Sequence, residues 1–191
     1  MIRPSISFEF FPPKSLQASF SLWNCVQTLA QIDPSFVSVT YGAGGTTRQL
    51  THDAVDAIIK TTDLQVAAHL TCVNATRHET LAIAADYNAT GVTHIIALRG
   101  DPPKRSGDYC THEDSFQSSI ELTSALANKG FDVTVGAYPE GHPNASNKEA
   151  CIDHLKAKID AGATRAITQF FFEADTFLRF RDACADAGIT A

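Results

Sequence analysis

The stretch VAAHLTCV, residues 66–73, decides how the rest of the chain is interpreted. It is almost continuously apolar and lacks the strict alternation of a half-exposed strand. Continuous runs of this length are typical of parallel strands, because helices cover the faces of a parallel sheet. The stretch therefore predicts a strand inside a parallel β-sheet.

Five comparable runs lie on either side of it, at residues 6–11, 36–41, 94–98, 133–138 and 166–172. Successive runs begin roughly 30 to 40 residues apart, which is the length of one βα unit. Apolar residues recur at helical spacing in the intervals, over residues 15–32, 51–60, 76–87, 115–127, 148–161 and 174–187. The predicted order is a strand followed by a helix, repeated about six times.

Two α/β architectures fit this order: a doubly wound open sheet and a barrel of eight βα units. A barrel occupies about 250 residues, about two units more than this chain of 191 residues holds. Residues 188–191 have the character of a seventh strand that begins and is cut off. We therefore expect a single domain over residues 1–191 that is incomplete at its C-terminus.

Composition narrows the classes of function. Apolar residues make up 44% of the chain and charged residues 19%, as in folded globular proteins. The net charge of -6, without any run of Lys and Arg, argues against a nucleic-acid partner. We expect no membrane segment, because no apolar run approaches the roughly 20 residues that a membrane helix needs. Five scattered cysteines and no signal peptide predict free thiols in a cytoplasmic protein.

Glu9 lies within the apolar run FEFF, residues 8–11. On an early strand it is expected to face the interior of the sheet or barrel, where burial without a partner would raise its pKa. A carboxyl group that stays protonated near neutrality is suited to general acid catalysis. The alternative is a structural carboxylate paired with an arginine. We favour a functional role, because carboxylates are rarely buried otherwise.

Polar residues recur at the carboxyl ends of other predicted strands, where both architectures bind ligands. The segment TYGAGGTTR, residues 40–48, allows close backbone approach at a helix N-terminus but lacks the dinucleotide fingerprint. Arg99 could hold a phosphate, and Asp101 could accept hydrogen bonds from a nitrogen-rich ring. Residues 137–143 are expected to form a rigid polar loop, and Gln169 is expected to be a buried amide that needs partners. Each has a structural alternative: a connecting loop, an Arg–Asp pair, a surface turn or a core glutamine.

His69 lies inside the apolar stretch 66–73, and on pattern alone it is a core histidine. No spacing of His, Cys and carboxylate residues supports a metal site. No nucleophile motif such as Gly-x-Ser-x-Gly occurs either. We expect no metal.

Six short motifs occur in order along nearly the whole chain. They are SFEFFPPK (7–14), VTYGA (39–43), HLTC (69–72), LRGD (98–101), AYPE (137–140) and ITQFFF (167–172). Each is short, but the ordered set is very specific. As a set, the motifs resemble those of the methylenetetrahydrofolate reductase family.

The resemblance implies a (βα)8 TIM barrel, truncated here to about six βα units, that carries non-covalent FAD. The family reduces 5,10-methylenetetrahydrofolate to 5-methyltetrahydrofolate in one-carbon metabolism and methionine biosynthesis. NADH or NADPH first reduces the flavin and leaves, and the folate then accepts hydride, which is a ping-pong scheme. The resemblance also implies a homo-oligomer.

The resemblance assigns roles to single residues. Glu9 matches the general acid that helps to open the five-membered ring of the folate. Asp101 matches an aspartate near the flavin that contacts the folate, and Gln169 matches a folate-binding glutamine. Cys151 departs from the family, because an aspartate holding the sugar or adenine end of the flavin is expected there. The positions that match cofactor contacts are Thr40, Tyr41, Ala43, His69, Arg99, Gly100, Asp101, Tyr138, His142 and Lys158.

Two competing interpretations remain at this point. One is a different barrel enzyme, such as an aldolase or lyase, that uses a strand-end carboxylate without flavin. The other is a non-catalytic fragment or interaction module, because an open barrel of six units exposes two sheet edges. On that ground, a reading frame that stops at Ala191 is expected to give an insoluble or inactive product.

Overall fold

The computed structural model describes residues 5–41, 48–101 and 113–190. Strands and helices alternate throughout the described part of the chain. In order, the elements are β1 (Ser7–Phe10), α1 (Leu16–Ala30), β2 (Phe36–Val39), α2 (Arg48–Thr61), β3 (Val66–Thr71), α3 (Arg77–Ala89), β4 (His94–Leu98), α4 (Ser119–Ala127), β5 (Asp132–Ala137), α5 (Lys148–Asp160), β6 (Arg165–Thr168) and α6 (Ala174–Asp186). The predicted repeat of strand and helix is confirmed.

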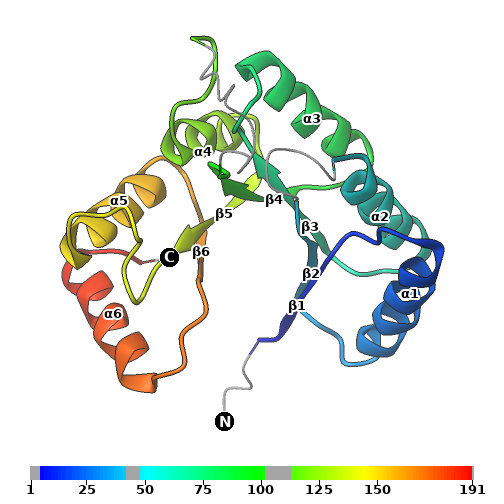
Figure 1. The fold of residues 1–191 in the computed structure, drawn as a ribbon, viewed down its shortest axis with the longest axis horizontal. Helices are drawn as coiled ribbons and strands as arrows, with labels where there is room; N and C mark the ends of the chain where they lie inside the picture. Colours follow the sequence, from blue (N-terminus) through cyan, green and yellow to red (C-terminus); the bar gives the residue numbers. More distant parts are fainter. Residues whose placement is uncertain (1–4, 42–47, 102–112, 191) are drawn as a thin grey trace.

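The strands form one parallel sheet in the order β1-β2-β3-β4-β5-β6, so each strand pairs only with its neighbours in the chain. The sheet curls, with the strands on the inner side and the helices around the outside (Figure 1). Within the described residues, β1 and β6 are the two ends of the curl and do not pair. The fold is a curled half-barrel consistent with a truncated (βα)8 barrel. The doubly wound alternative is excluded, because it would place helices on both faces.

The hydrophobic core fills the layer between the sheet and the helices. Val37 and Val39 of β2 and Leu70 of β3 are fully buried in it. Because successive side chains of a strand point to opposite faces, Ser38 and His69 lie on the inner face of the sheet. The helices thus cover an apolar face, and polar groups are displayed on the concave one.

Side-chain caps fix where the helices begin. Thr76 and Glu79 form a reciprocal capping box at the start of α3. Ser118 caps α4, since its Oγ accepts the backbone N–H of Glu121 at 3.2 Å. Caps of this kind are worth about 1 kcal/mol each. They set the first turn of each helix relative to the strand before it.

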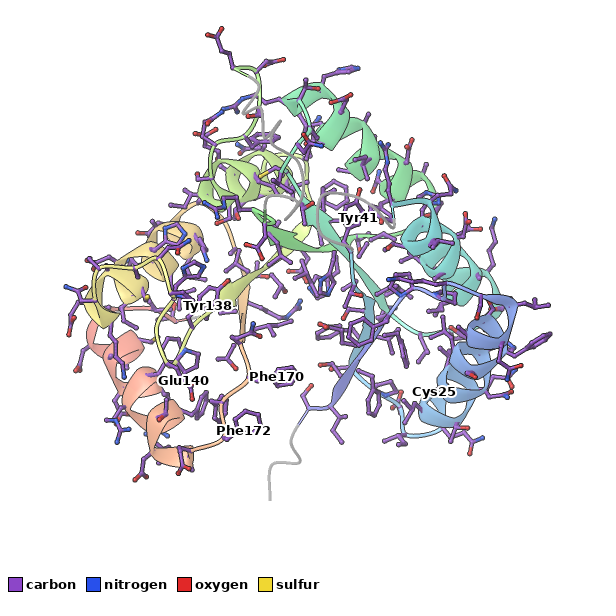
Figure 2. All side chains as sticks on the ribbon, viewed as in Figure 1. Cys25, Tyr41, Tyr138, Glu140, Phe170 and Phe172 are labelled. Atoms are coloured by element: carbon purple, nitrogen blue, oxygen red, sulfur yellow. The ribbon has the colours of Figure 1, made fainter. Side chains whose placement is uncertain are left out.

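Strand β6 is shorter than the sequence predicts. The apolar run 166–172 continues past Thr168, but Thr168 pairs with Ala137, the last residue of β5. Residues 169–172 therefore lie outside the sheet, because β5 has no strand residue left to pair with them. Phe170 and Phe172 are 84% and 90% exposed, and both labelled rings lie beyond the end of β6 (Figure 2).

Candidate active site

A cavity of about 660 Å³ lies at the carboxyl ends of β4 and β5. Its walls come from these strand ends, the start of α4, the loop after β5, and α5. This edge is where parallel α/β folds bind their ligands. Six residues with predicted cofactor contacts line this one cavity: Arg99, Gly100, Asp101, Tyr138, His142 and Lys158.

Lys158 is a buried cation in the cavity wall. The residue is 5% exposed, and its Nζ donates to the carbonyl oxygen of Gly136 at 2.8 Å. The same atom lies 6.0 Å from the centroid of the Tyr138 ring. Burial lowers the pKa of Lys158 to about 8, because the charged form loses hydration. No ion pair to it occurs among the described residues. An anionic ligand would supply the missing counter-charge.

The loop after β5 and helix α5 form the adjoining wall. The rings of Tyr138 and His142 meet edge to face, with centroids 4.7 Å apart. The backbone N–H of His142 donates to Cys151 Sγ at 3.2 Å, which ties the loop to α5. Burial, followed by the nearby charge of Lys158, lowers the pKa of His154. This wall gathers cationic and imidazole groups, and Cys151 lies among them.

Residues 99–101 leave β4 at the edge of the same cavity. The carbonyl of Arg99 accepts the backbone N–H of Val73 at 2.9 Å, which fixes the segment against the chain leaving β3. Burial, and then the carboxylate of Asp101, raise the pKa of Tyr138. Asp101 therefore acts electrostatically on the wall that β5 contributes.

Gly100 permits this tight exit, and Gly100→Ala is expected to destabilise it. Gly100 has φ +84°, and an added Cβ would lie 2.6 Å from Val73 Cγ1 and 3.0 Å from Thr71 Cβ. The strained backbone conformation and the contacts should together lower the free energy of unfolding by about 1–3 kcal/mol. Urea denaturation of both proteins measures the change. Gly130→Ala, where a Cβ meets nothing within 4 Å, controls for the positive φ alone. Equal losses in the two variants would contradict the packing argument.

Glu9 faces the inner side of the sheet as predicted, but the expected burial and raised pKa are wrong. Its register partner is Ser38, and its side chain is 49% exposed. The imidazole of buried His69 lies with Nε2 3.4 Å from Glu9 Oε2. Hydrogen bonding from His69 lowers the pKa of Glu9 despite the opposing effect of burial. The reason is that β1 ends the sheet, which leaves Glu9 open on one side and an imidazole within reach on the other.

The sequence did not identify His69 as the partner of Glu9. The structural role considered there paired Glu9 with an arginine, whereas the structure pairs it with a histidine. Ser38 Oγ also lies 3.4 Å from His69 Nε2. His69 does not line the 660 Å³ cavity. The structure thus joins Glu9, Ser38 and His69 into a polar cluster spanning β1, β2 and β3.

The other predicted residues are spread along the same edge of the sheet. Thr40 follows β2, and its backbone carbonyl accepts the hydroxyl of Thr51 from α2 at 2.9 Å. Burial raises the pKa of Tyr41, which Figure 2 labels across the curl from Tyr138. Ala43 lies outside the described residues. Neither Thr40 nor Tyr41 lines the 660 Å³ cavity.

Gln169 is not the buried amide that the aromatic run suggests. It is exposed just past β6, where its backbone N–H donates to the carbonyl of Ala137 at 2.7 Å. Its own side-chain oxygen accepts the backbone N–H of Phe170 at 3.3 Å. Its side chain therefore remains at the rim of the sheet, close to the end of β5.

Sequence reasoning missed the wall contributed by the start of α4. Gln117 and Ser118 line the cavity there, ahead of the first helical residue Ser119. The predicted helix began at residue 115 because apolar spacing alone was considered. The signal that could have found the boundary is Ser118 followed three residues later by Glu121, a capping-box pattern.

Neither a metal site nor a membrane span was found in the part of the chain that the structure describes. No three His, Cys, Asp or Glu side chains there are grouped so as to hold a metal ion. No described helix is both long enough and apolar enough to cross a membrane.

The half-barrel and its strand-end cavity define an α/β protein of the βα-barrel class. The fold is also seen in 2,3-dimethylmalate lyase, a member of the PEP mutase/isocitrate lyase superfamily. That structure matches with a TM-score of 0.63 at 10% identity, covering 95% of this chain and 63% of that chain. At this identity the likeness establishes the fold alone.

The chain belongs to the methylenetetrahydrofolate reductase family, whose sequence model matches residues 2–191. It is 48% identical to the 5,10-methylenetetrahydrofolate reductase of Salmonella typhimurium, over 97% of this chain and 61% of that protein. It is 32% identical to methylenetetrahydrofolate reductase (NADH) 1 of Zea mays, over 98% of this chain and 34% of that protein. The chain therefore spans about three fifths of the length of the bacterial relative that it matches.

Proposed function

We propose that the protein reduces 5,10-methylenetetrahydrofolate to 5-methyltetrahydrofolate, with FAD as cofactor and NADH or NADPH as electron donor. The observation that carries the proposal is that six positions matching cofactor contacts of the family lie together in one cavity of a chain from this family. They come from two successive βα units, three from the exit of β4 and three from the loop after β5 and α5, so the fold brings together segments that are roughly 40 residues apart in the sequence. An aldolase or lyase role without flavin has no comparable support.

The donor set of the cavity fits a flavin dinucleotide. Arg99, His142 and Lys158 are cationic or can become so, and the buried ammonium of Lys158 has no carboxylate counter-ion among the described residues. A diphosphate would neutralise such a wall through charge-assisted hydrogen bonds. The chemistry that bound FAD supplies is hydride transfer, from NAD(P)H and then to the folate in ping-pong order.

The chain's own residues would bind, orient and protonate. Lys158 and Arg99 would hold anionic groups, and Asp101 would orient the folate ring. Glu9 would deliver a proton to the folate nitrogen as the five-membered ring opens. His69, within hydrogen-bond reach of Glu9, would hold that carboxyl in place. Gln169, at the end of β6, would contact the folate from the other end of the curl.

Reconstitution with FAD tests the proposal directly. The full-length protein, purified with its complete barrel, should show visible flavin absorbance, and NAD(P)H should bleach that absorbance in the absence of oxygen. Addition of methylenetetrahydrofolate should then restore it with formation of 5-methyltetrahydrofolate. A colourless protein that neither retains nor takes up FAD would count decisively against the proposal.

Cys151 offers a test of where FAD binds. Cys151 lines the cavity, whereas Cys25 is exposed on α1. FAD at about ten times its dissociation constant should slow alkylation of Cys151 by about tenfold, in proportion to occupancy. Mass spectrometry of maleimide-labelled peptides measures both thiols in one sample. Cys25 should react at the same rate with and without FAD. Unchanged labelling of Cys151 would place FAD elsewhere.

The cellular setting follows from the same proposal. Reduction of a one-carbon unit to the methyl level belongs to one-carbon metabolism, and it would supply methyl groups for methionine biosynthesis. We propose a cytoplasmic homo-oligomer with no nucleic-acid or membrane partner. The single catalytic domain over residues 1–191 is proposed as a part of the complete barrel.

A further inference from the structure

The start of α4 forms one wall of the cavity. Gln117, Ser118 and Ser119 line it, and α4 begins at Ser119. The first backbone N–H groups of a helix have no partner within the helix, so this wall presents donors whose placement depends on the helix end. The position of residues 117–119 therefore shapes one side of the cavity.

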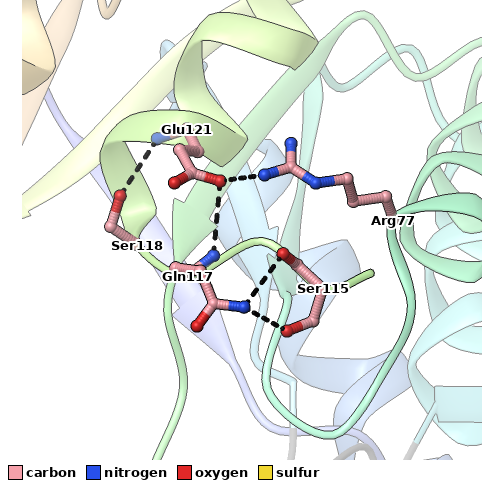
Figure 3. Close-up of polar contacts among 5 residues, drawn as sticks. All are labelled: Arg77, Ser115, Gln117, Ser118 and Glu121. Carbon is pink, nitrogen blue, oxygen red and sulfur yellow. Dashed lines mark hydrogen bonds and ion pairs between the residues drawn. The ribbon is translucent and has the colours of Figure 1, made fainter. Parts of the chain in front are cut away.

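Glu121 holds this wall in place without lining the cavity. A single carboxylate oxygen, Oε2, accepts from Arg77 Nη2 and from the backbone N–H of Gln117 at 3.4 Å (Figure 3). Its own backbone N–H donates to the cap Ser118 at 3.2 Å. The two residues immediately before α4 are thus tied to one glutamate.

Arg77, the first residue of α3, contacts the same segment at three points. Its backbone N–H donates to the carbonyl of Asp114 at 2.7 Å. Its guanidinium lies 4.6 Å from the ring centroid of buried Phe116, within cation–π range. Its Nη2 donates to Glu121. A helix from the preceding βα unit therefore fixes the approach to α4.

The exposure of the Arg77–Glu121 ion pair indicates that it fixes local geometry rather than stabilising the whole fold. The side chains of Arg77 and Glu121 are 42% and 39% exposed. Ion pairs this open to water contribute little to global stability. Their directed hydrogen bonds can still fix the geometry of the segment that they join, and that segment is a cavity wall.

We propose that Arg77 and Glu121 are positioning residues that set the α4 wall of the cavity and thereby the affinity for FAD. This role rests on the proposed function, since FAD is the ligand concerned. Neither side chain lines the cavity, so both act through Gln117 and Ser118. Without the pair, residues 115–119 lose the side-chain contacts through which Arg77 and Glu121 hold them, while the backbone bond from Arg77 to Asp114 remains, so bound FAD escapes more readily.

Arg77→Ala and Glu121→Gln test the role in the purified protein. Each should raise the FAD dissociation constant by about fivefold to tenfold, mainly through faster dissociation. Flavin fluorescence during titration and stopped-flow release measures both quantities. Arg77→Lys, which keeps the charge, should recover part of the affinity. The thermal midpoint of the FAD-free protein should change little, which separates positioning from a structural loss.

Two matched variants show whether the loss of any helix cap, or of any exposed ion pair, is enough to weaken FAD binding. Thr76→Ala removes the cap of the same helix, and Lys60→Ala removes an exposed ion pair to Asp56 at 2.8 Å on α2. Both should bind FAD as the unaltered protein does. Wild-type affinity in Arg77→Ala, or an equal loss in Thr76→Ala, would overturn this inference alone. Failure of the unaltered protein to bind FAD would instead overturn the proposed function, and this inference with it.

Discussion

Glu9→Gln is expected to lower the rate of folate reduction by about 100-fold or more, because general acid catalysis is typically worth that much. Glutamine keeps the size of the side chain and can still contact His69, but it cannot deliver a proton. FAD binding and oxidation of NAD(P)H should persist, since neither step uses this proton. Separate assays of the two half-reactions measure the effect. Normal folate turnover in the variant would sink the general-acid assignment.

Glu173→Gln is the matched control for Glu9→Gln. Glu173 is an exposed carboxylate that precedes α6, and its side chain makes no capping hydrogen bond. Both folate reduction and NAD(P)H oxidation should be unchanged in this variant. A loss in both glutamine variants would point to a general effect of charge at this edge of the sheet.

The contact with His69 gives Glu9 a distinctive pH dependence. It lowers the Glu9 pKa below the ordinary 4.5, so the carboxyl is ionised at neutral pH. Folate reduction should therefore accelerate as the pH falls toward the Glu9 pKa, and Glu9→Gln should lack this acceleration. The same contact stabilises the fold above the ordinary pKa, and this stabilisation is lost as the pH falls through the lowered value.

Lys158→Met is expected to weaken FAD binding by about 10- to 100-fold, the usual worth of a charge-assisted hydrogen bond to an anion. In the unaltered protein, FAD affinity should decline as the pH rises through about 8, where Lys158 loses its proton. Titration with FAD across this pH range measures both effects. Lys158→Met should bind weakly at every pH, without this decline.

The variant should also be at least as stable as the unaltered protein without FAD. Below about pH 8 the lysine is charged in both folded and unfolded chains, and its burial costs free energy. That cost is relieved as the pH rises from about 8 toward the ordinary 10.5, so the unaltered protein gains stability over this window. Methionine is spared the cost at all pH values. A marked loss of stability in the variant would show that Lys158 is structural.

Lys156→Met provides the control, two residues away on the same helix. Lys156 pairs with Asp160 at 2.7 Å on the surface and does not line the cavity. Its loss should leave FAD affinity and the pH dependence unchanged. A weakening comparable to that of Lys158→Met would mean that net charge, rather than the buried cation, governs binding.

The fold was predictable because each strand carries its own signal. The run at residues 66–73 is apolar because β3 is buried along its whole length. The absence of polar alternation in the sequence therefore indicated a strand covered on both faces. The end of β6 was not predictable, since residues 169–172 have the composition of a strand. What stops the strand is the length of β5 beside it, which is a property of the pairing and not of the run.

The site was predictable in part for a similar reason. Parallel strands bring their carboxyl ends to one edge, so Arg99 and Tyr138, which follow two neighbouring strands, could be assigned to a common edge from the sequence, whereas Lys158 was assigned through the family resemblance. The environment of Glu9 was not predictable, because its pKa depends on an imidazole from two strands away. The α4 wall escaped notice because it is built by serine and glutamine, which carry no chemical signature of their own.

The strictly sequential order of the strands has a consequence for folding kinetics. Every pairing in the sheet joins segments one βα unit apart, so no strand pair requires the closure of a loop longer than one such unit. Assembly can nucleate at any adjacent pair and spread in both directions, as in linear repeat proteins. β3 and β4, the central pair of the sheet, are the natural nucleus, and the two ends of the curl should be the first segments to exchange their amide hydrogens.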